Sequence, residues 1–263
     1  MVRTPMALYI HETGSPGAPS IVFLHGVGTG GWMWKLQADA LSEFHCIAVD
    51  LPGHAKSNQI PWVSFEDTAA QIAAIIQARA TNQHAHIVGL SLGGYIALVM
   101  LVTYSQFVDC VVASGVTSEP MPNRSLLPLQ LFVLNLIWKR RWFANMHARS
   151  SNLPEEMKAD LVTNMHAMSM DAYRKITREA AYFSLPTALS AVDNPTLVVA
   201  GGAESEIIKQ AVADIIQMMP NAEGRLAPGL GHGWNVENPD LFSAMVRAWI
   251  TDQPLPQALQ RIT

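Results

Sequence analysis

The chain has 263 residues, of which 49% are hydrophobic, so it can bury a sizeable core as one large or two small domains, and intrinsic disorder is excluded. A formal net charge of −4 and the lack of a long Lys/Arg run argue against a nucleic-acid partner. Cys46 and Cys110 exclude a disulfide framework, although one bridge stays possible, and both lie in apolar runs where free buried thiols are expected.

The N-terminal part alternates strand-like and helix-like segments. Residues 8–12 alternate weakly and predict an edge strand, whereas the apolar run 21–24 predicts a strand buried on both faces. The segments that follow are expected to be helix 32–42, strand 45–50, helix 64–80, strand 85–89, helix 93–104 and strand 108–113. Ser64 followed by Asp67 resembles a capping box. The alternation predicts a parallel sheet with right-handed crossovers.

The pattern changes after Gly115. Residues 116–186 contain no convincing strand and predict helices over 126–148, 155–168 and 171–183. We interpret this segment as an inserted helical lid, with residues 1–115 and 187–263 forming the core. Its methionine and aromatic side chains are individually typical packing residues, but together they predict an apolar pocket ceiling: Trp138, Trp142, Phe143, Met146, Met165, Met168, Met170 and Phe183.

The strand and helix alternation resumes near Pro195. It predicts strand 196–200, helix 206–219, strand 223–227 and a last helix over 239–251. The tail from Asp252 contains two prolines and little pattern.

Two stretches bear on membranes and location. Residues 1–10 contain one arginine and no long apolar region, unlike a secretory signal, so a cytoplasmic location is expected. Residues 126–138 are strongly apolar but too short to span a bilayer. They could lie at a membrane interface, but a buried or pocket-lining helix is expected, so we predict no stable membrane insertion. No pattern indicates an oligomeric state.

A glycine-rich loop, residues 25–31, follows the first buried strand. A phosphate cradle is improbable, because the loop lacks the Walker Lys-Ser/Thr pair and the G-x-G-x-x-G order before a helix. An exposed loop with inward-pointing N–H groups fits better.

Gly89-Leu90-Ser91-Leu92-Gly93 has the G-x-S-x-G pattern of a nucleophile elbow. A strand that turns abruptly into a helix strains the serine backbone and brings neighbouring turns too close for a Cβ, which Gly89 and Gly93 avoid. The helix N-terminus beside Ser91 also favours a negatively charged oxygen. Because a simple glycine turn gives the same pattern, the context must decide.

That context resembles the α/β-hydrolase fold family. His25-Gly26 follows a strand, Ser91 lies in its elbow, an acid occurs within 201–206 after a later strand, and Gly231-His232 precedes the last helix. The order Ser, acid, His is the one this fold requires. The resemblance covers nearly the whole chain and implies an α/β fold with a mostly parallel central sheet flanked by helices.

The same residues define a candidate triad. A serine hydroxyl is a weak nucleophile near neutral pH, so a base must take its proton, and we assign that role to His232. A carboxylate must orient His232. The family usually has Asp about three residues after the strand's final glycine, and Glu204 stands there. Glu119, after the strand before the lid, is the second choice, and Glu206 the third, because an acid in a first helical turn favours the helix dipole.

The resemblance also implies an oxyanion hole and a pocket. The backbone N–H groups of Val27 and Leu92 would meet the developing negative charge. The expected pocket residues are His25, Gly26, Trp138, Trp142, Met146, Met168 and Trp234. We interpret Glu237 as structural, either holding its loop or capping the last helix. No histidine shows metal-ligand spacing, so neither a metal nor a cofactor is implied.

Together these features predict a cofactor-independent serine hydrolase. Its substrate would be a small to medium apolar ester, thioester or lactone, cleaved through an acyl-enzyme on Ser91. The Ser nucleophile disfavours dehalogenase and epoxide hydrolase chemistry, which this fold supports with an aspartate. The alternatives are a C–C bond hydrolase or lyase that uses the same triad, and a slow-turnover small-molecule receptor of the same fold.

Overall fold

The computed structural model describes residues 7–122, 124–138, 140–150 and 153–262, and its described strands form one eight-stranded sheet. The strand order is β1-β3-β2-β4-β5-β6-β7-β8. The strands are β1 (Ile10–Gly14), β2 (Ser20–Leu24), β3 (His45–Val49), β4 (Ala85–Leu90), β5 (Val108–Ser114), β6 (Thr196–Gly201), β7 (Ala222–Ala227) and β8 (Gln260–Ile262). All neighbours from β3 to β7 are parallel, while β1 and β8 pair antiparallel at the two edges. The predicted mostly parallel sheet is confirmed.

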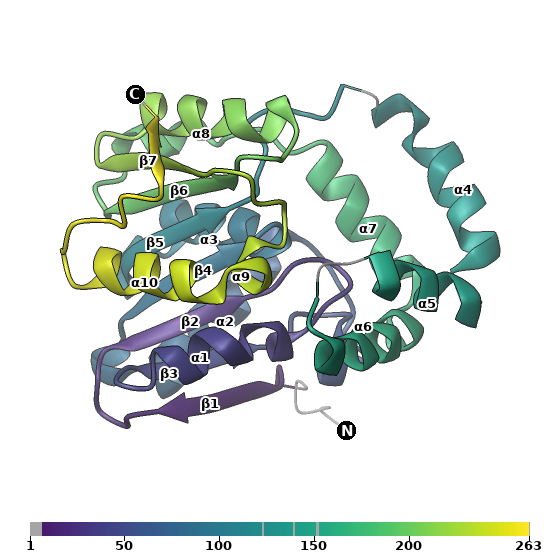
Figure 1. Cartoon of the computed structure of the whole chain (residues 1–263), viewed down its shortest axis with the longest axis horizontal. Helices are drawn as coiled ribbons and strands as arrows, with labels where there is room; N and C mark the ends of the chain where they lie inside the picture. The colour runs from purple at the N-terminus through teal and green to yellow at the C-terminus, as the bar shows by residue number, and fades with distance from the viewer. Residues whose placement is uncertain (1–6, 123, 139, 151–152, 263) are drawn as a thin grey trace.

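Helices cover both faces of this sheet (Figure 1). Buried residues of α2, α3 and α8 pack with one set of strand side chains, and those of α1 and α10 pack with the other. The helices are α1 (Lys35–Ala40), α2 (Phe65–Arg79), α3 (Leu92–Thr103), α4 (Leu127–Ile137), α5 (Arg141–Ser150), α6 (Glu155–Ala167), α7 (Met170–Ala181), α8 (Glu206–Met218), α9 (Trp234–Glu237) and α10 (Pro239–Ile250). The Ser64 hydroxyl caps α2 by accepting from the Asp67 N–H at 3.1 Å, as its pattern predicts.

Four helices, α4 to α7, lie between β5 and β6 in the chain and gather beyond one end of the sheet (Figure 1). The predicted helix 126–148 is wrong as a single element, because α4 ends at Ile137 and α5 begins at Arg141; Lys139 lies outside the described residues. The break lets Trp138 turn inward onto Tyr173, with ring centroids 4.4 Å apart, and lets Ala144 of α5 become fully buried. The division into a core and a lid stays a prediction.

The tail after Asp252 contains β8, which the sequence did not predict. Three residues are too few to show alternation, and this strand is added to the sheet by pairing with β7, where Arg261 lies opposite Arg225. Cys46 and Cys110 are both free and buried, and burial raises the pKa of each thiol to about 12. Within the described ranges, no helix has the length and apolar character needed to cross a membrane. The expected absence of a secretory signal concerns residues 1–10, and residues 1–6 lie outside the described part.

Candidate active site

Ser91 lies in a strained turn between β4 and α3. Its φ of 55° and ψ of −113° are unusual for a residue with a side chain. A Cβ on Gly93 would lie 2.0 Å from the carbonyl oxygen of Leu24, and one on Gly89 would lie 2.3 Å from the Gly93 carbonyl oxygen. Both glycines are therefore required by close backbone approach, which is the steric reason given for the G-x-S-x-G spacing.

The elbow is fixed to the neighbouring strands by backbone hydrogen bonds. The Ser91 N–H donates to the Ser114 carbonyl at 2.7 Å, and the Gly93 N–H donates to the His25 carbonyl at 3.1 Å. These bonds hold the serine at the carboxyl ends of three adjacent parallel strands, β2, β4 and β5. In open α/β sheets this edge is where ligands bind.

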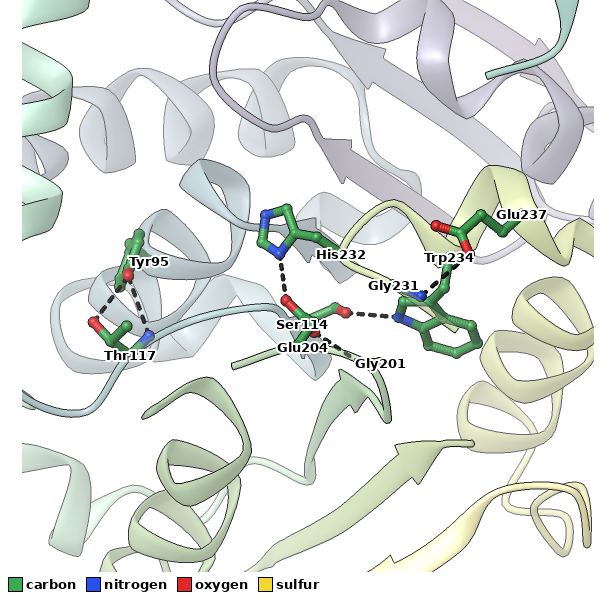
Figure 2. Close-up of polar contacts among 9 residues, drawn as sticks. All are labelled: Tyr95, Ser114, Thr117, Gly201, Glu204, Gly231, His232, Trp234 and Glu237. Carbon is green, nitrogen blue, oxygen red and sulfur yellow. Dashed lines mark hydrogen bonds and ion pairs between the residues drawn. The ribbon is translucent and has the colours of Figure 1, made fainter. Parts of the chain in front are cut away.

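His232 and Glu204 form a hydrogen-bonded pair (Figure 2). The Nδ1 atom of His232 bonds to Oε1 of Glu204, while Oε2 of Glu204 accepts the Gly201 N–H at 2.7 Å. The Glu204 side chain is only 2% exposed, whereas that of His232 is 47% exposed. Because the acid is buried and its second oxygen is bonded, its orientation is fixed. The histidine is held through Nδ1, while its Nε2 has no hydrogen-bond partner among the described residues.

The other two candidate acids do not contact His232 within the described residues. Glu119 is exposed in the segment after β5, and Glu206 pairs with Lys209 in the first turn of α8 at 2.5 Å. Glu237 holds its loop, since its Oε2 accepts the Gly231 N–H at 3.1 Å, whereas Asn238 caps α10. The arrangement brings together Ser91, the loop of residues 228–233 that carries His232 (the histidine loop), and Glu204, the first-ranked acid.

Gly115 lies directly against this pair and was not singled out from the sequence. A Cβ at this position would lie 2.7 Å from Cε1 of His232 and 2.9 Å from Nδ1. Its φ of +69° also favours glycine. The available signal was a glycine immediately after the last residue of a buried strand, since β5 ends at Ser114.

Replacing Gly115 with alanine should therefore displace the His232 ring from Glu204 and lower kcat by about 10²-fold, the typical effect of a misplacement near 1 Å. Gly17→Ala is the matched control, because Gly17 has a similar φ of +85° but a Cβ there would have no neighbouring atom within 4 Å. Steady-state kinetics on both variants, with thermal unfolding beside them, separates backbone strain from ring displacement. Equal kcat values for the two variants would contradict this role of Gly115.

The His25 ring holds the glycine loop in place through hydrogen bonds. The Leu51 N–H donates to its Nε2 at 3.0 Å, which places the ring hydrogen on Nδ1, the atom that donates to the Gly26 carbonyl at 2.8 Å. Burial lowers the pKa of His25 to about 4, so the ring is neutral near pH 7. Thr29 Oγ1 donates to the same Gly26 carbonyl at 2.7 Å. The expected contact of His25 with a substrate is wrong, because the ring is fully buried and fixes the loop.

The two candidate oxyanion donors flank Ser91. Leu92 is the first residue of α3, so its N–H has no carbonyl one turn earlier in the helix. Val27 lies on the glycine loop, in which a Cβ on Gly26 would lie 3.6 Å from Cβ of Ser91. Neither N–H donates to another backbone carbonyl in the turns and loops of the described residues. Both donors are thus available to a bound ligand.

A cavity of about 560 Å³ joins Ser91 and His232. Its walls come from the glycine loop, the histidine loop and helices α4 to α7, and they are mostly apolar. They consist of Gly26, Val27, Gly28, Thr29, Met33, Leu90, Ser91, Leu134, Trp138, Phe143, Leu153, Leu161, Met165, Tyr173, Gly231, His232, Gly233, Asn235, Val236 and Glu237. The volume suits a small to medium ligand.

Of the expected pocket residues, Gly26 and Trp138 line this cavity. Trp142 and Met146 do not, because α5 turns them outward, where they are 56% and 52% exposed. Met168 is buried beside the cavity at the end of α6, where its carbonyl accepts from Nε1 of Trp138 at 3.4 Å. Trp234 is buried too, and its Nε1 donates to Oγ of Ser114 at 3.0 Å (Figure 2).

Among the described residues, no three His, Cys, Asp or Glu side chains gather in a way that could hold a metal ion. The cavity brings together a strained serine, a histidine paired with a buried acid, and two candidate N–H donors. On a mostly parallel sheet, these features define the α/β-hydrolase class. A model of the Alpha/beta hydrolase family matches residues 21–245, and the chain belongs to this family.

Relatives align with most of the chain. One, from Serratia proteamaculans (strain 568), is named 2-succinyl-6-hydroxy-2,4-cyclohexadiene-1-carboxylate synthase; it is 26% identical, with 94% of this chain and 99% of the relative covered. Another, from Pseudomonas sp, is named 2-hydroxy-6-oxononadienedioate/2-hydroxy-6-oxononatrienedioate hydrolase and is also 26% identical, with 91% and 90% covered. The crystal structure of a hydrolase from Pseudomonas aeruginosa PA01 has a TM-score of 0.78 at 19% identity, with 92% of this chain and 94% of that chain covered, a likeness of fold.

Proposed function

We propose that the protein is a cofactor-independent serine hydrolase of neutral, apolar esters, thioesters or lactones. The observation that carries the proposal is the cavity in which Ser91 meets a histidine whose Nδ1 is bonded to the buried Glu204. Membership of the Alpha/beta hydrolase family supports hydrolysis as the reaction class.

In the first half of the reaction, the Ser91 hydroxyl attacks the substrate carbonyl carbon. His232 Nε2 takes the hydroxyl proton, and the Glu204 carboxylate stabilises the imidazolium through Nδ1–H. The oxyanion of the tetrahedral intermediate accepts hydrogen bonds from the Val27 and Leu92 N–H groups, each contributing on the order of 3 kcal/mol. Collapse breaks the bond to the leaving group, which takes the proton from His232, and leaves an acyl group on Ser91.

In the second half, water attacks the acyl-enzyme. His232 takes a proton from the water, the oxyanion forms in the same hole, and collapse returns the proton to Oγ of Ser91 as the acid is released. Every step uses only these side chains, the two backbone N–H groups and water.

The cavity wall favours neutral substrates. The described lining includes no lysine or arginine, and Glu237 and His232 are its ionisable groups apart from Tyr173. A buried carboxylate on a substrate would lack a charged partner there, which costs several kcal/mol. The two relatives are named for a carboxylate and a dioate, so the substrate proposed here differs from theirs in charge.

Those names also support a second candidate, a C–C bond hydrolase or lyase that uses the same triad. This second candidate is the weaker one, because the described cavity lining has no lysine or arginine to pair with an acidic substrate. A slow-turnover receptor of the same fold would keep the cavity but accumulate bound ligand without product.

Labelling with a fluorophosphonate probe, followed by peptide mass spectrometry, tests the proposal. We expect a stoichiometric adduct on Ser91, no adduct with Ser91→Ala, and turnover of a neutral aryl butyrate at least tenfold faster than of a matched hemisuccinate. Absence of the adduct, with tight ligand binding, would favour the receptor; a faster hemisuccinate reaction would overturn the neutral-substrate assignment.

A further inference from the structure

Helix α4 exposes a row of large apolar side chains, which we call the α4 outer face: Leu126, Leu129, Phe132, Val133 and Leu136. Each is between 51% and 64% exposed. Leu126 precedes the helix, and the spacing of three or four residues between most members places them along one side. In Figure 1, α4 lies at the outer edge of the molecule, away from the sheet.

The opposite side of α4 is apolar as well. Leu127 and Leu131 are buried against Ala181 of α7, and Leu134 and Trp138 line the catalytic cavity. A helix at a protein surface needs one apolar side, while a helix that is apolar all round is normally covered on every side. The protein covers the inner side of α4 and leaves the outer face in contact with solvent.

The stretch of sequence that contains the outer face is positively charged, in contrast to the chain as a whole. Residues 120–154 contain five Lys/Arg and no Asp/Glu, although the net charge of the chain is −4. The arginines of this stretch whose side chains are described, Arg124, Arg140 and Arg149, form no ion pair with a described carboxylate. Their charges are therefore available to an anionic partner.

A groove of about 510 Å³ joins these two properties. It lies between α4 and α7 and is lined by three arginines, Arg124, Arg174 and Arg178, together with Leu127, Pro128, Leu131, Phe132 and Tyr182. Phe132 belongs to both the groove and the outer face. Guanidinium groups bind phosphate oxygens with paired hydrogen bonds, so a phosphate could bind in the groove while acyl chains contact the adjoining leucines.

We propose that the α4 outer face docks reversibly on a lipid bilayer that contains anionic phospholipids. An apolar face with Leu and Phe, bordered by arginines, is the pattern of a helix that lies in the headgroup region, and anionic lipids attract such cations. Two large apolar side chains of α5, Trp142 and Met146, are exposed as well. This docking differs from insertion and goes beyond the hydrolase function.

Sedimentation with vesicles tests the docking. The Ser91→Ala protein is used, so that lipid hydrolysis does not alter the vesicles and the result does not depend on the proposed function. We expect it to sediment with vesicles of phosphatidylcholine and phosphatidylglycerol in equal parts, to bind pure phosphatidylcholine at least tenfold more weakly, and to dissociate as salt is raised.

Paired variants locate the surface. Leu129→Gln with Leu136→Gln should weaken binding at least about tenfold, because two exposed side chains lose their apolar contact. Arg174→Gln with Arg178→Gln should weaken it about fivefold for each charge removed. Val63→Gln, which changes a side chain 62% exposed elsewhere, and Arg261→Gln on β8 are matched controls that should bind as the parent does.

Three outcomes would overturn the proposal: no binding to anionic vesicles, equal loss in the controls, or self-association in sedimentation velocity that the Leu129→Gln/Leu136→Gln protein loses while vesicle binding is absent. The last would assign the face to a second copy of the chain. None of them bears on the reactivity of Ser91, which fluorophosphonate labelling reports separately.

Discussion

Replacing Ser91 with alanine should lower kcat on a neutral aryl ester by on the order of 10⁶-fold, and His232→Ala should do about the same. The two groups act in one proton transfer, so either replacement removes the whole nucleophilic step. The double variant should consequently be no slower than the slower single variant. Residual turnover would come from the oxyanion donors and from binding in the cavity.

Steady-state kinetics on the three variants and the parent protein measures this coupling. Circular dichroism and thermal unfolding serve as controls for folding, because Ser91 occupies a strained turn and alanine must adopt the same positive φ. Losses that multiply in the double variant would show that Ser91 and His232 act independently, which would contradict the triad.

The turn at Ser91 and the position of Glu204 beside His232 were predictable because both depend on local spacing. Gly89 and Gly93 are imposed by backbone atoms only 2.0–2.3 Å from a hypothetical Cβ, and such a constraint appears directly in the sequence. Glu204 follows Gly201 by three residues, and this short turn lets its carboxylate accept the Gly201 N–H. In both cases, contacts between residues close in the sequence determine which residue type can stand at each position.

The pocket was less predictable, because it depends on how helices rotate about their axes. Trp142 and Phe143 are neighbours in α5, yet the first is exposed and the second lines the cavity. Leu134 and Tyr173 line it too, and their residue types give no signal for that. The break between α4 and α5 contains neither Gly nor Pro; it goes with the inward packing of Trp138, a tertiary contact that the sequence does not reveal.

The second large effect on kcat is expected when the carboxylate that bonds to His232 is replaced. Glu204→Gln should lower kcat by on the order of 10⁴-fold, whereas Glu119→Gln and Glu206→Gln should each stay within about twofold of the parent. A glutamine keeps the size of the side chain but removes the charge that stabilises the imidazolium. If its NH₂ group faces the histidine, it also donates to Nδ1 and moves the ring hydrogen to Nε2, where the base must be free.

Glu204→Asp sharpens this test. It keeps the charge but shortens the side chain by one methylene, so the carboxylate cannot reach both the Gly201 N–H and His232 Nδ1 with the same geometry. We expect a kcat between those of the parent and Glu204→Gln. The Glu204 side chain is only 2% exposed, so either substitution can also lower the stability of the fold. The parent, Glu204→Gln and Glu204→Asp proteins should therefore be compared at matched folded fraction, measured by urea unfolding. If Glu119→Gln lost activity while Glu204→Gln kept it, the acid would come from the segment after β5, and the observed Glu204–His232 bond would be structural.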